Sequence, residues 1–161
     1  MPQFLTYLRP AQYDDCAAIY YVHRHAVRYT CLQSYDEQIM HDWLQLIDQD
    51  IYTDTIDASD KTLWVAEFQG RIQGFVQVDF QEAQLDALYV HPFLHNKGLG
   101  TALLQRAEQL AADNNLSILS LFASKNSIPF YRLNGYDSLG KAAVPINPKT
   151  KIKCQLMRKF L

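Results

Sequence analysis

Residues 85–115, LDALYVHPFLHNKGLGTALLQRAEQLAADNN, decide the fold. They begin as a strand-like apolar run that Pro92 ends, pass through a polar loop with two glycines, and continue as a helical pattern. From Gly98 onward, apolar residues recur at three- and four-residue steps until DNN closes the helix. A loop between a strand and a helix presents the unpaired N–H groups of the first helical turn, where the helix dipole favours an anion. The stretch therefore predicts a strand–loop–helix unit that binds phosphate.

Three kinds of phosphate-binding loop are compatible with a glycine-rich turn. The dinucleotide fingerprint requires a third glycine at position 103, where this chain has Leu103. The P-loop requires GxxxxGK followed by Ser or Thr, and no such string occurs. Without side chains, Gly98 and Gly100 let an anion approach the backbone, and Lys97 adds a positive charge beside it. Neither the dinucleotide fingerprint nor the P-loop fits this loop, which leaves a third kind of phosphate-binding loop.

The residues before this stretch alternate between strand and helix patterns. FLTYLR (4–9) predicts a strand, and residues 16–27 repeat apolar side chains at helical spacing. In SYDE, Ser34 as N-cap and Glu37 form a predicted capping box for a second helix. DQDIYTDTIDASD (48–60) has five aspartates and no regular period, which predicts a loop. LWVAEF and RIQGFVQVDF flank Gln69 and Gly70 as an antiparallel hairpin does.

The residues after the stretch complete the element order. LSILSLF (116–122) is almost continuously apolar, which predicts a strand covered on both faces. SIPFYRLN predicts a short helix stopped by Gly135, and KIKCQLMRKF a final strand. The order β, α, α, β, β, β, α, β, α, β, β contains a central strand–helix–strand unit that implies parallel pairing. We therefore expect one α/β domain over residues 1–161.

Composition narrows the classes of function. The 161 residues carry a net charge of -2 and no concentrated basic face, which argues against a nucleic-acid partner. No apolar run approaches the roughly 18 residues of a membrane span, and the N-terminus lacks a signal-peptide pattern. The three cysteines have no CxxC spacing and the five histidines form no helical ligand pair, so we expect reduced thiols and no metal site. A soluble, cytoplasmic protein is expected.

HNKGLG after LYVHP resembles the pyrophosphate loop of the GNAT superfamily of N-acyltransferases, written as Gln or Arg, two residues, Gly, one residue, then Gly or Ala. SKNSIPFYRLNGY (124–136) resembles the second signature of that family, an Asn, then Phe-Tyr, then Gly-Tyr or Gly-Phe. The element order is similar along nearly the whole chain. His95 departs from the pattern, since Gln or Arg is usual there, and this puts in doubt a role for that side chain.

The resemblance implies a GNAT-like mixed, mostly antiparallel sheet with a central parallel strand pair splayed around the cofactor and helices on both faces. It implies an N-acetyltransferase that moves an acetyl group from acetyl-CoA to a primary amine by direct attack in a ternary complex. The N–H of Val90 would polarise the thioester carbonyl. The implied cofactor-binding residues are Leu88, Tyr89, Val90, His95, Asn96, Lys97, Gly98, Leu99, Gly100, Thr101 and Asn126.

The resemblance also suggests groups that move protons. Tyr131 corresponds to the tyrosine that protonates the leaving thiolate in many members, with a plain core tyrosine as the alternative. Asp86, four residues before Val90 and so expected on the same face of the strand, is a candidate base. Glu67 is its rival, and a chain of waters is a third possibility. Asn126 would fix the cofactor amide or serve as a helix N-cap.

The acceptor is a small-molecule amine or a peptide amine. In this fold it enters past RYTCLQSY, where Tyr29 and Tyr35 would line the mouth or form the core edge. The five aspartates of 48–60 would attract a cationic amine or simply be solvated. A monomer and a homodimer both remain open. The alternative function is a non-catalytic acyl-CoA-binding regulatory module; Tyr131 and Asp86 favour the enzyme over it.

Overall fold

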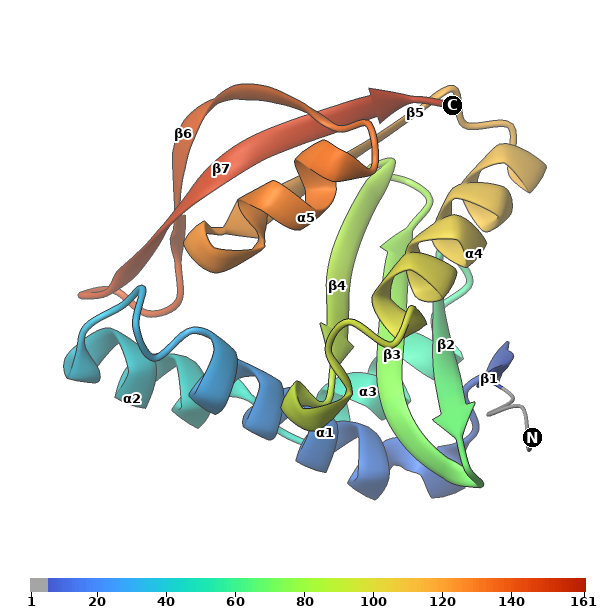
Figure 1. The fold of residues 1–161 in the computed structure, drawn as a ribbon, viewed down its shortest axis with the longest axis horizontal. Helices are drawn as coiled ribbons and strands as arrows, with labels where there is room; N and C mark the ends of the chain where they lie inside the picture. Colours follow the sequence, from blue (N-terminus) through green and yellow to red (C-terminus); the bar gives the residue numbers. More distant parts are fainter. Residues whose placement is uncertain (1–5) are drawn as a thin grey trace.

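One seven-stranded sheet in the order β1-β2-β3-β4-β5-β7-β6 organises the protein (Figure 1). The structure, a computed structural model, describes residues 6–161; residues 4 and 5 of the first predicted strand lie outside the described residues. The strands are β1 (Thr6–Pro10), β2 (Lys61–Phe68), β3 (Arg71–Asp79), β4 (Gln84–Val90), β5 (Ile118–Ser124), β6 (Asp137–Pro145) and β7 (Lys151–Phe160). The helices are α1 (Cys16–Thr30), α2 (Glu37–Leu46), α3 (Asp50–Asp57), α4 (Leu99–Asp113) and α5 (Ile128–Leu133), with short 3-10 turns η1 (Tyr13–Asp15), η2 (Pro92–Leu94) and η3 (Lys125–Ser127).

The sheet is antiparallel except at its centre. Strands β1 to β4 form an antiparallel meander, and β5, β7 and β6 form a second antiparallel group. Strands β4 and β5, which α4 connects, form the one parallel pair within residues 6–161. The predicted fold class is confirmed. The predicted hairpin is confirmed as well: Gln69 and Gly70 join β2 to β3 with φ angles of 55° and 77°, the left-handed region that a tight hairpin turn requires.

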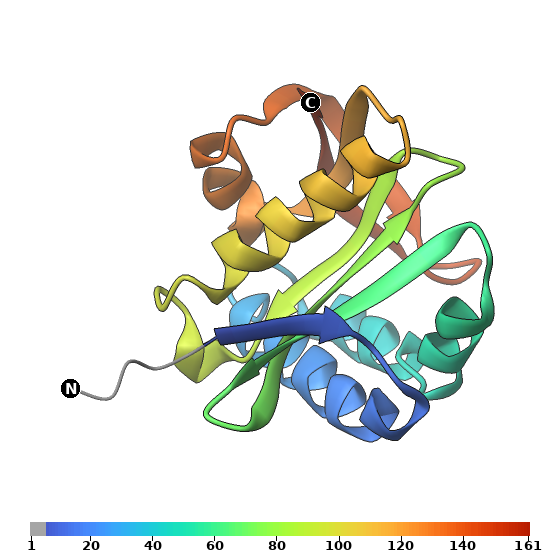
Figure 2. The same cartoon turned by 90° about the vertical axis from the view of Figure 1, so that its right-hand side faces the viewer.

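Helices cover both faces of the first sheet half, as Figure 2 shows, with α4 on one side and α1 and α3 on the other. The alternation along β3 explains this arrangement, because neighbouring side chains of a strand face opposite ways. Phe75 joins an apolar cluster with α1, whereas Val76 joins the cluster that α4 completes with Leu103 and Ala107. Each helix therefore buries its apolar stripe against one face.

Two predictions in the first half are wrong. Residues 50–57 form helix α3 instead of a loop, because Tyr52 and Thr55, three residues apart, bury one helical face. Asp50, Asp54 and Asp57 lie among the other positions of the helix, so the sequence does not show a regular apolar stripe. The N-cap of α2 is Asp36 and not Ser34: the Asp36 side chain accepts from the N–H of Ile39 at 2.9 Å.

The prediction that residues 116–122 are covered on both faces is also wrong. Leu119 and Leu121 of β5 are buried, but Phe122 is 43% exposed. Phe122 lines the cavity described below, so this face of β5 lies against open space and not against a helix. The apolar residues of this strand therefore serve two purposes: some are buried in the core, and Phe122 forms part of a cavity wall.

Candidate active site

Strands β4 and β5 diverge, and this divergence creates the site. Their parallel pairing consists of one register pair, Gln84 with Ser120, reinforced by the Ser120 N–H donating to the carbonyl of Ala83 at 3.0 Å. Figure 1 shows the two strands close together at one end and well apart at the other. Beyond this junction, the β4 edge that faces β5 has no strand to pair with.

The register of β4 decides which backbone groups face the divergence. The N–H of His91 donates to the carbonyl of Gln73 at 2.8 Å, so it points towards β3. Because successive residues of a strand direct their N–H and C=O groups to alternate sides, those of Val90 and Leu88 point away from β3. These are two of the residues for which the family resemblance implies contact with the cofactor.

The glycine loop lies at the open end of this divergence. Gly98 is the N-cap of α4 with φ 85° and ψ 0°, a left-handed conformation in which glycine has little strain. A Cβ added at Gly98 would meet no atom within 4 Å, so the space over the loop is open. No side chain among residues 6–161 caps the first turn of α4, which leaves its N–H groups available to an anion.

His95 is engaged with the protein backbone. Its Nε2 lies 3.1 Å from the carbonyl oxygen of Val90. A carbonyl oxygen only accepts, so Nε2 carries the proton in this bond. The side chain that replaces the usual Gln or Arg therefore holds the loop against the end of β4 while the N–H of Val90 stays free of it.

A cavity of about 570 Å³ lies between the diverging strands. One wall is the glycine loop with Phe130, and a second is formed by β4, β5 and Tyr131. We call the third the acceptor wall. It consists of residues from α1, its C-cap, α2 and the β6–β7 hairpin: Ala26, Thr30, Cys31, Trp43, Leu46, Val144, Ile146, Ile152 and Cys154.

Most of the predicted cofactor residues line this cavity: Leu88, Tyr89, Val90, His95, Asn96, Gly98, Gly100, Thr101 and Asn126. Lys97 and Leu99 do not. The side chain of Leu99 is fully buried in the core under α4, so only its backbone could serve a ligand. Lys97 is exposed beside the loop, where its charge acts over a longer range.

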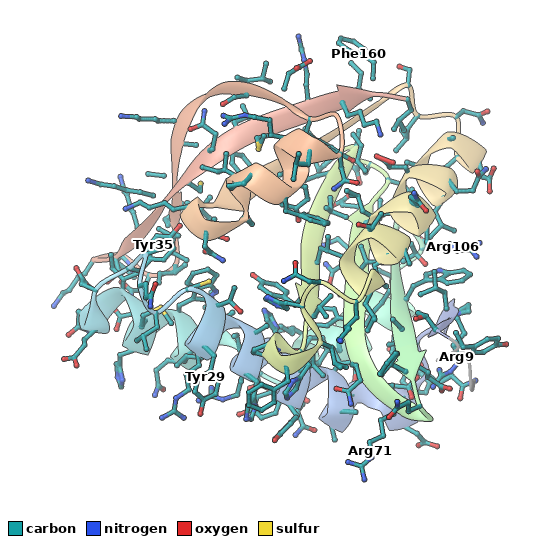
Figure 3. The ribbon with its side chains drawn as sticks, in the orientation of Figure 1. Arg9, Tyr29, Tyr35, Arg71, Arg106 and Phe160 are labelled. Atoms are coloured by element: carbon teal, nitrogen blue, oxygen red, sulfur yellow. The ribbon has the colours of Figure 1, made fainter. Side chains whose placement is uncertain are left out.

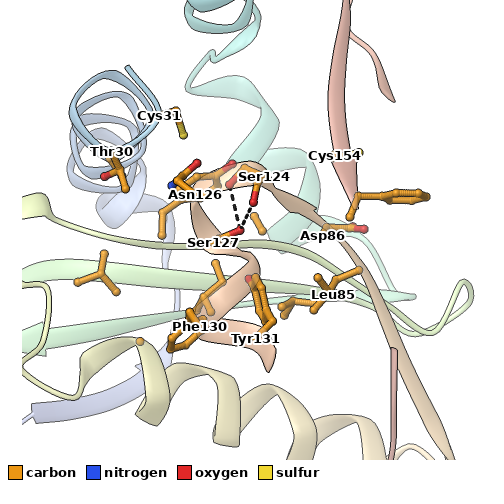
Figure 4. A pocket seen from close by; sticks show the side chains of 18 of the residues that line it. Thr30, Cys31, Leu85, Asp86, Ser124, Asn126, Ser127, Phe130, Tyr131 and Cys154 are labelled. Carbon is orange, nitrogen blue, oxygen red and sulfur yellow. Dashed lines mark hydrogen bonds between the residues drawn. The ribbon is translucent and has the colours of Figure 1, made fainter. Parts of the chain in front are cut away.

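Tyr131 and Asp86 line the same cavity, and Figure 4 shows both side chains. Tyr131 is 7% exposed and packs edge-on against Phe130 and Tyr136. Burial raises the pKa of Tyr131, so its hydroxyl is protonated at neutral pH and is able to donate. It is thus both a core residue and a cavity residue.

A β-bulge at Asp86 changes the face on which this residue lies. Gln77 of β3 is opposite Ala87, and Val78 is opposite Leu85, so Asp86 is an extra residue in β4. An extra residue of this kind shifts the alternation of side chains along the strand. The simple period of two, which placed Asp86 on the face of Val90, does not hold across this bulge.

The contacts of Asp86 confirm the shift. Its Oδ2 accepts from Gln77 Nε2 at 3.0 Å, and Gln77 Oε1 accepts from the hydroxyl of Thr55 in α3 at 3.2 Å. Asp86 therefore lies towards the α3 face, whereas Val90 packs with the α4 cluster. The prediction of a shared face is wrong. Burial raises the pKa of Asp86, with the hydrogen bond from Gln77 opposing that effect.

Glu67 is not brought to the cavity. Its carboxylate accepts from Arg9 Nε at 2.9 Å, and Arg9 also forms a bidentate pair with Asp15 at 2.7 and 2.9 Å. Glu67 belongs to β2, which β3 separates from β4. Glu67, the second candidate for the base, is therefore held in an ion-pair network outside the cavity.

The two predicted mouth tyrosines have different places, and Figure 3 labels both. Tyr29 is 59% exposed and lies beside His25, outside the cavity lining. Tyr35 is buried; its hydroxyl donates to the carbonyl of Lys153 at 2.6 Å and accepts from the N–H of Lys125 at 3.0 Å. Tyr35 therefore fastens the α1–α2 connection to β7 and η3 behind the acceptor wall.

Two buried polar atoms in this region have no hydrogen-bond partner among residues 6–161: Thr30 Oγ1 and Asn126 Oδ1. Both residues line the cavity, and Figure 4 shows them near Cys31. Burial of a polar atom without a partner is costly, so such atoms mark where a ligand would bond. Sequence analysis identified Asn126 but missed Thr30, because a threonine at the end of a helix carries no distinguishing pattern.

The rest of the acceptor wall was also missed. Trp43 belongs to a helix stripe that is typical of core, Leu46 is an exposed residue at the end of α2, and Ile152 comes from the distant β7. Only the α1–α2 connection was expected there. Periodicity within one element does not reveal which of its apolar residues face a cavity formed by another.

The chain belongs to the GNAT acetyltransferase domain family, which matches residues 31–148. It is similar to a GCN5-related N-acetyltransferase structure from Rhodopseudomonas palustris, with 26% identity, a TM-score of 0.89, and coverage of 100% of this chain and 99% of that one. It shares its fold with the PaiA N-acetyltransferase of Thermoplasma acidophilum in complex with coenzyme A, with 20% identity, a TM-score of 0.82, and coverage of 98% and 99%.

The uncharacterised protein YxbD of Bacillus subtilis is 30% identical over 92 residues, which span 54% of this chain and 58% of that protein. The match to this relative therefore covers little more than half of its length.

No helix within residues 6–161 has the length and apolar character needed to cross a bilayer. No three His, Cys, Asp or Glu side chains of these residues gather closely enough to hold a metal ion.

Proposed function

We propose that the protein is an N-acetyltransferase that moves an acetyl group from acetyl-CoA to a primary amine in a ternary complex. The observation that carries the proposal is the divergence of β4 from β5 beside the uncapped N-terminus of α4. Together they offer an unpaired strand edge and a set of helical N–H groups along one cavity. This is the arrangement that a long ligand with amides and a pyrophosphate requires.

The residues present fit such a cofactor. The loop from Asn96 to Thr101 would hold the pyrophosphate, since the space over Gly98 is open and the first turn of α4 is uncapped. The backbone of Leu88 and Val90 would bond the pantetheine amides, and Asn126 Oδ1, buried without a partner among residues 6–161, would accept from an N–H. Bound acetyl-CoA supplies an acetyl group activated as a thioester.

The protein's own groups would manage two protons. Tyr131, kept protonated by burial, would donate the proton that the departing sulfur needs. Asp86 would take the proton of the amine, because its raised pKa makes it a stronger base than an ordinary carboxylate. The N–H of Val90 would stabilise charge on the reacting carbonyl oxygen.

We also propose that the chain acts as one domain in the cytoplasm. The single sheet that runs from β1 to β6 supports one domain. The three cysteines are all free and buried, which suits a reducing compartment.

The cofactor site is tested with a charge placed on the first turn of α4. Thr101 lines the cavity at the third helical position, where an acidic residue favours the helix. Thr101→Glu would therefore keep or raise thermal stability while repelling a phosphate. We expect coenzyme A to bind Thr101→Glu at least about tenfold more weakly than the matched neutral variant Thr101→Gln, by titration calorimetry. Equal affinities would remove the anion-site assignment.

The reaction is tested by thiol release from acetyl-CoA across classes of primary amine. Tyr131→Phe keeps the packing and removes the donor, so kcat is expected to fall about 100-fold while the Kd for coenzyme A stays within about twofold. Because a base acts in its deprotonated form, kcat of the native protein should rise with pH as Asp86 loses its proton, and Asp86→Asn should abolish that rise. Tight binding of coenzyme A without amine-dependent thiol release would instead indicate a regulatory acyl-CoA-binding module.

A further inference from the structure

We infer that the acceptor is a small primary amine with an apolar body, no second charge, and a neutral polar group near the amine. This inference rests on the proposed function, since it concerns the amine that the acceptor wall would receive. It names a class of substrate by the chemistry of the wall. Three features of the cavity support it: its charges, its apolar surface and one hydroxyl without a partner among residues 6–161.

The acceptor wall is apolar on its α2 and β7 sides. Trp43 and Ile152 belong to one hydrophobic cluster, which Cys31 and Tyr35 extend towards α1. Leu46, at the end of α2, faces the cavity from the more exposed rim. A ligand that replaces water here gains by burying apolar surface.

Charged groups are scarce around the cavity. Within residues 6–161, Asp86 is the one carboxylate among the lining residues, and no lysine or arginine lines it. Asp86 would pair with the reacting amine. A second ammonium group would have no carboxylate to pair with, and a substrate carboxylate would have no cation. An unpaired charge in a site removed from water is strongly unfavourable.

The aspartate-rich segment 48–60 adds no charged group to the cavity lining. None of the five aspartates between positions 48 and 60 lines the cavity, and Asp57 is engaged by the hydroxyl of Tyr13. Tyr52 and Thr55 are buried on the inner side of α3, and the three aspartates of this helix, Asp50, Asp54 and Asp57, are exposed. Polyamines and aminoglycosides, which carry several cations, therefore find no matching charge in the site.

Thr30 supplies the neutral polar contact. Its Oγ1 is buried in the wall with no partner among residues 6–161, although the residue lines the cavity. A hydroxyl both donates and accepts, so it suits an amide or a hydroxyl on the acceptor. Burial raises the pKa of the adjacent Cys31 thiol to about 11, so this thiol remains neutral.

The test compares four amines by thiol release, with the protein as it exists: 2-phenylethylamine, phenylalaninamide, phenylalanine and putrescine. The first two present one amine and an apolar body; phenylalanine adds a carboxylate and putrescine adds a second cation. We expect kcat/KM for phenylalaninamide to exceed the values for phenylalanine and putrescine about 100-fold or more. Phenylalanine or putrescine within tenfold of phenylalaninamide would overturn the inference while leaving the acetyltransferase intact.

Two pairs of variants examine the wall itself. Thr30→Val, which keeps the shape of the side chain, should lower the kcat/KM ratio of phenylalaninamide to 2-phenylethylamine about tenfold. Leu46→Asp should raise the ratio of putrescine to 2-phenylethylamine about tenfold over Leu46→Asn, its neutral control. Ratios that do not move would overturn the assignment of this wall to the acceptor. Absence of turnover with every amine, in protein that still binds coenzyme A, would overturn both the proposed function and this inference.

Discussion

Lowering the pH from 7 to 5 should destabilise the protein through one buried histidine, His23 of α1. Its side chain is 8% exposed, its Nδ1 lies 2.7 Å from the hydroxyl of Tyr52, and its ring packs against Phe75 and Tyr89 with centroids 5.2 and 4.5 Å apart. Burial, with a smaller effect of the positive charge on Arg24, lowers the pKa of His23 from 6.5 to about 3. The folded state therefore holds His23 neutral.

The size of the effect follows from linkage. Because the folded-state pKa is depressed, the unfolded chain binds a proton that the folded chain refuses, and stability is lost as pH falls below 6.5. With pKa values of 6.5 unfolded and about 3 folded, the free energy of unfolding falls by about 2 kcal/mol between pH 7 and pH 5. The slope near pH 5 is about 1.4 kcal/mol per pH unit.

Urea unfolding at pH 7, 6 and 5, followed by circular dichroism, measures this slope in the native protein and in His23→Gln. The variant lacks the titrating ring. From pH 7 to pH 5, its free energy of unfolding should therefore fall by about 2 kcal/mol less than that of the native protein. His41→Gln, a change at an exposed position of α2, is the control and should keep the native slope. Parallel pH profiles for the native protein and His23→Gln would refute the reasoning.

Three further predictions concern stability and are checked by urea unfolding at pH 7. Tyr35→Phe should lower the free energy of unfolding by about 1–3 kcal/mol, because two partly buried backbone groups, the N–H of Lys125 and the carbonyl of Lys153, lose their partner; an unchanged midpoint would contradict this. Gly74→Ala should lower it by about 1–3 kcal/mol, since the added Cβ would lie 3.0 Å from Leu103 Cδ1 and 3.1 Å from the carbonyl oxygen of Tyr89. Asp36→Ala should lower it by about 1 kcal/mol through loss of the α2 cap, and Asp36→Asn should restore most of that loss.

Local patterns predicted the centre of the protein well. The glycine loop and α4 are specified by neighbouring residues, since the left-handed glycine and the helical spacing both act within a few positions. The hairpin at Gln69 and Gly70 is specified in the same way. Sequence sufficed wherever the deciding contacts are close along the chain.

The incorrect predictions share a physical cause, because each of these structural features depends on contacts between residues that are distant in the sequence. The bulge at Asp86 arises from how β4 pairs with β3, and a period of two carries no sign of it. Glu67, a candidate base in the sequence, forms an ion pair with Arg9, 58 positions earlier, and local spacing carries no sign of this contact. Helix α3 depends on burial of Tyr52 against the sheet and not on its own aspartate-rich sequence.

The hydrogen bond between Tyr35 and the backbone of Lys153 joins groups 118 positions apart. Contacts of such long range close large loops, so they form late, after the local elements have gathered. On the ribosome the chain emerges from its N-terminus, so the Tyr35 hydroxyl can donate to the carbonyl of Lys153 only after β7 has been made. A chain that ended before β7 would therefore carry the glycine loop while lacking Ile152 and Cys154 of the acceptor wall and the carbonyl to which Tyr35 donates.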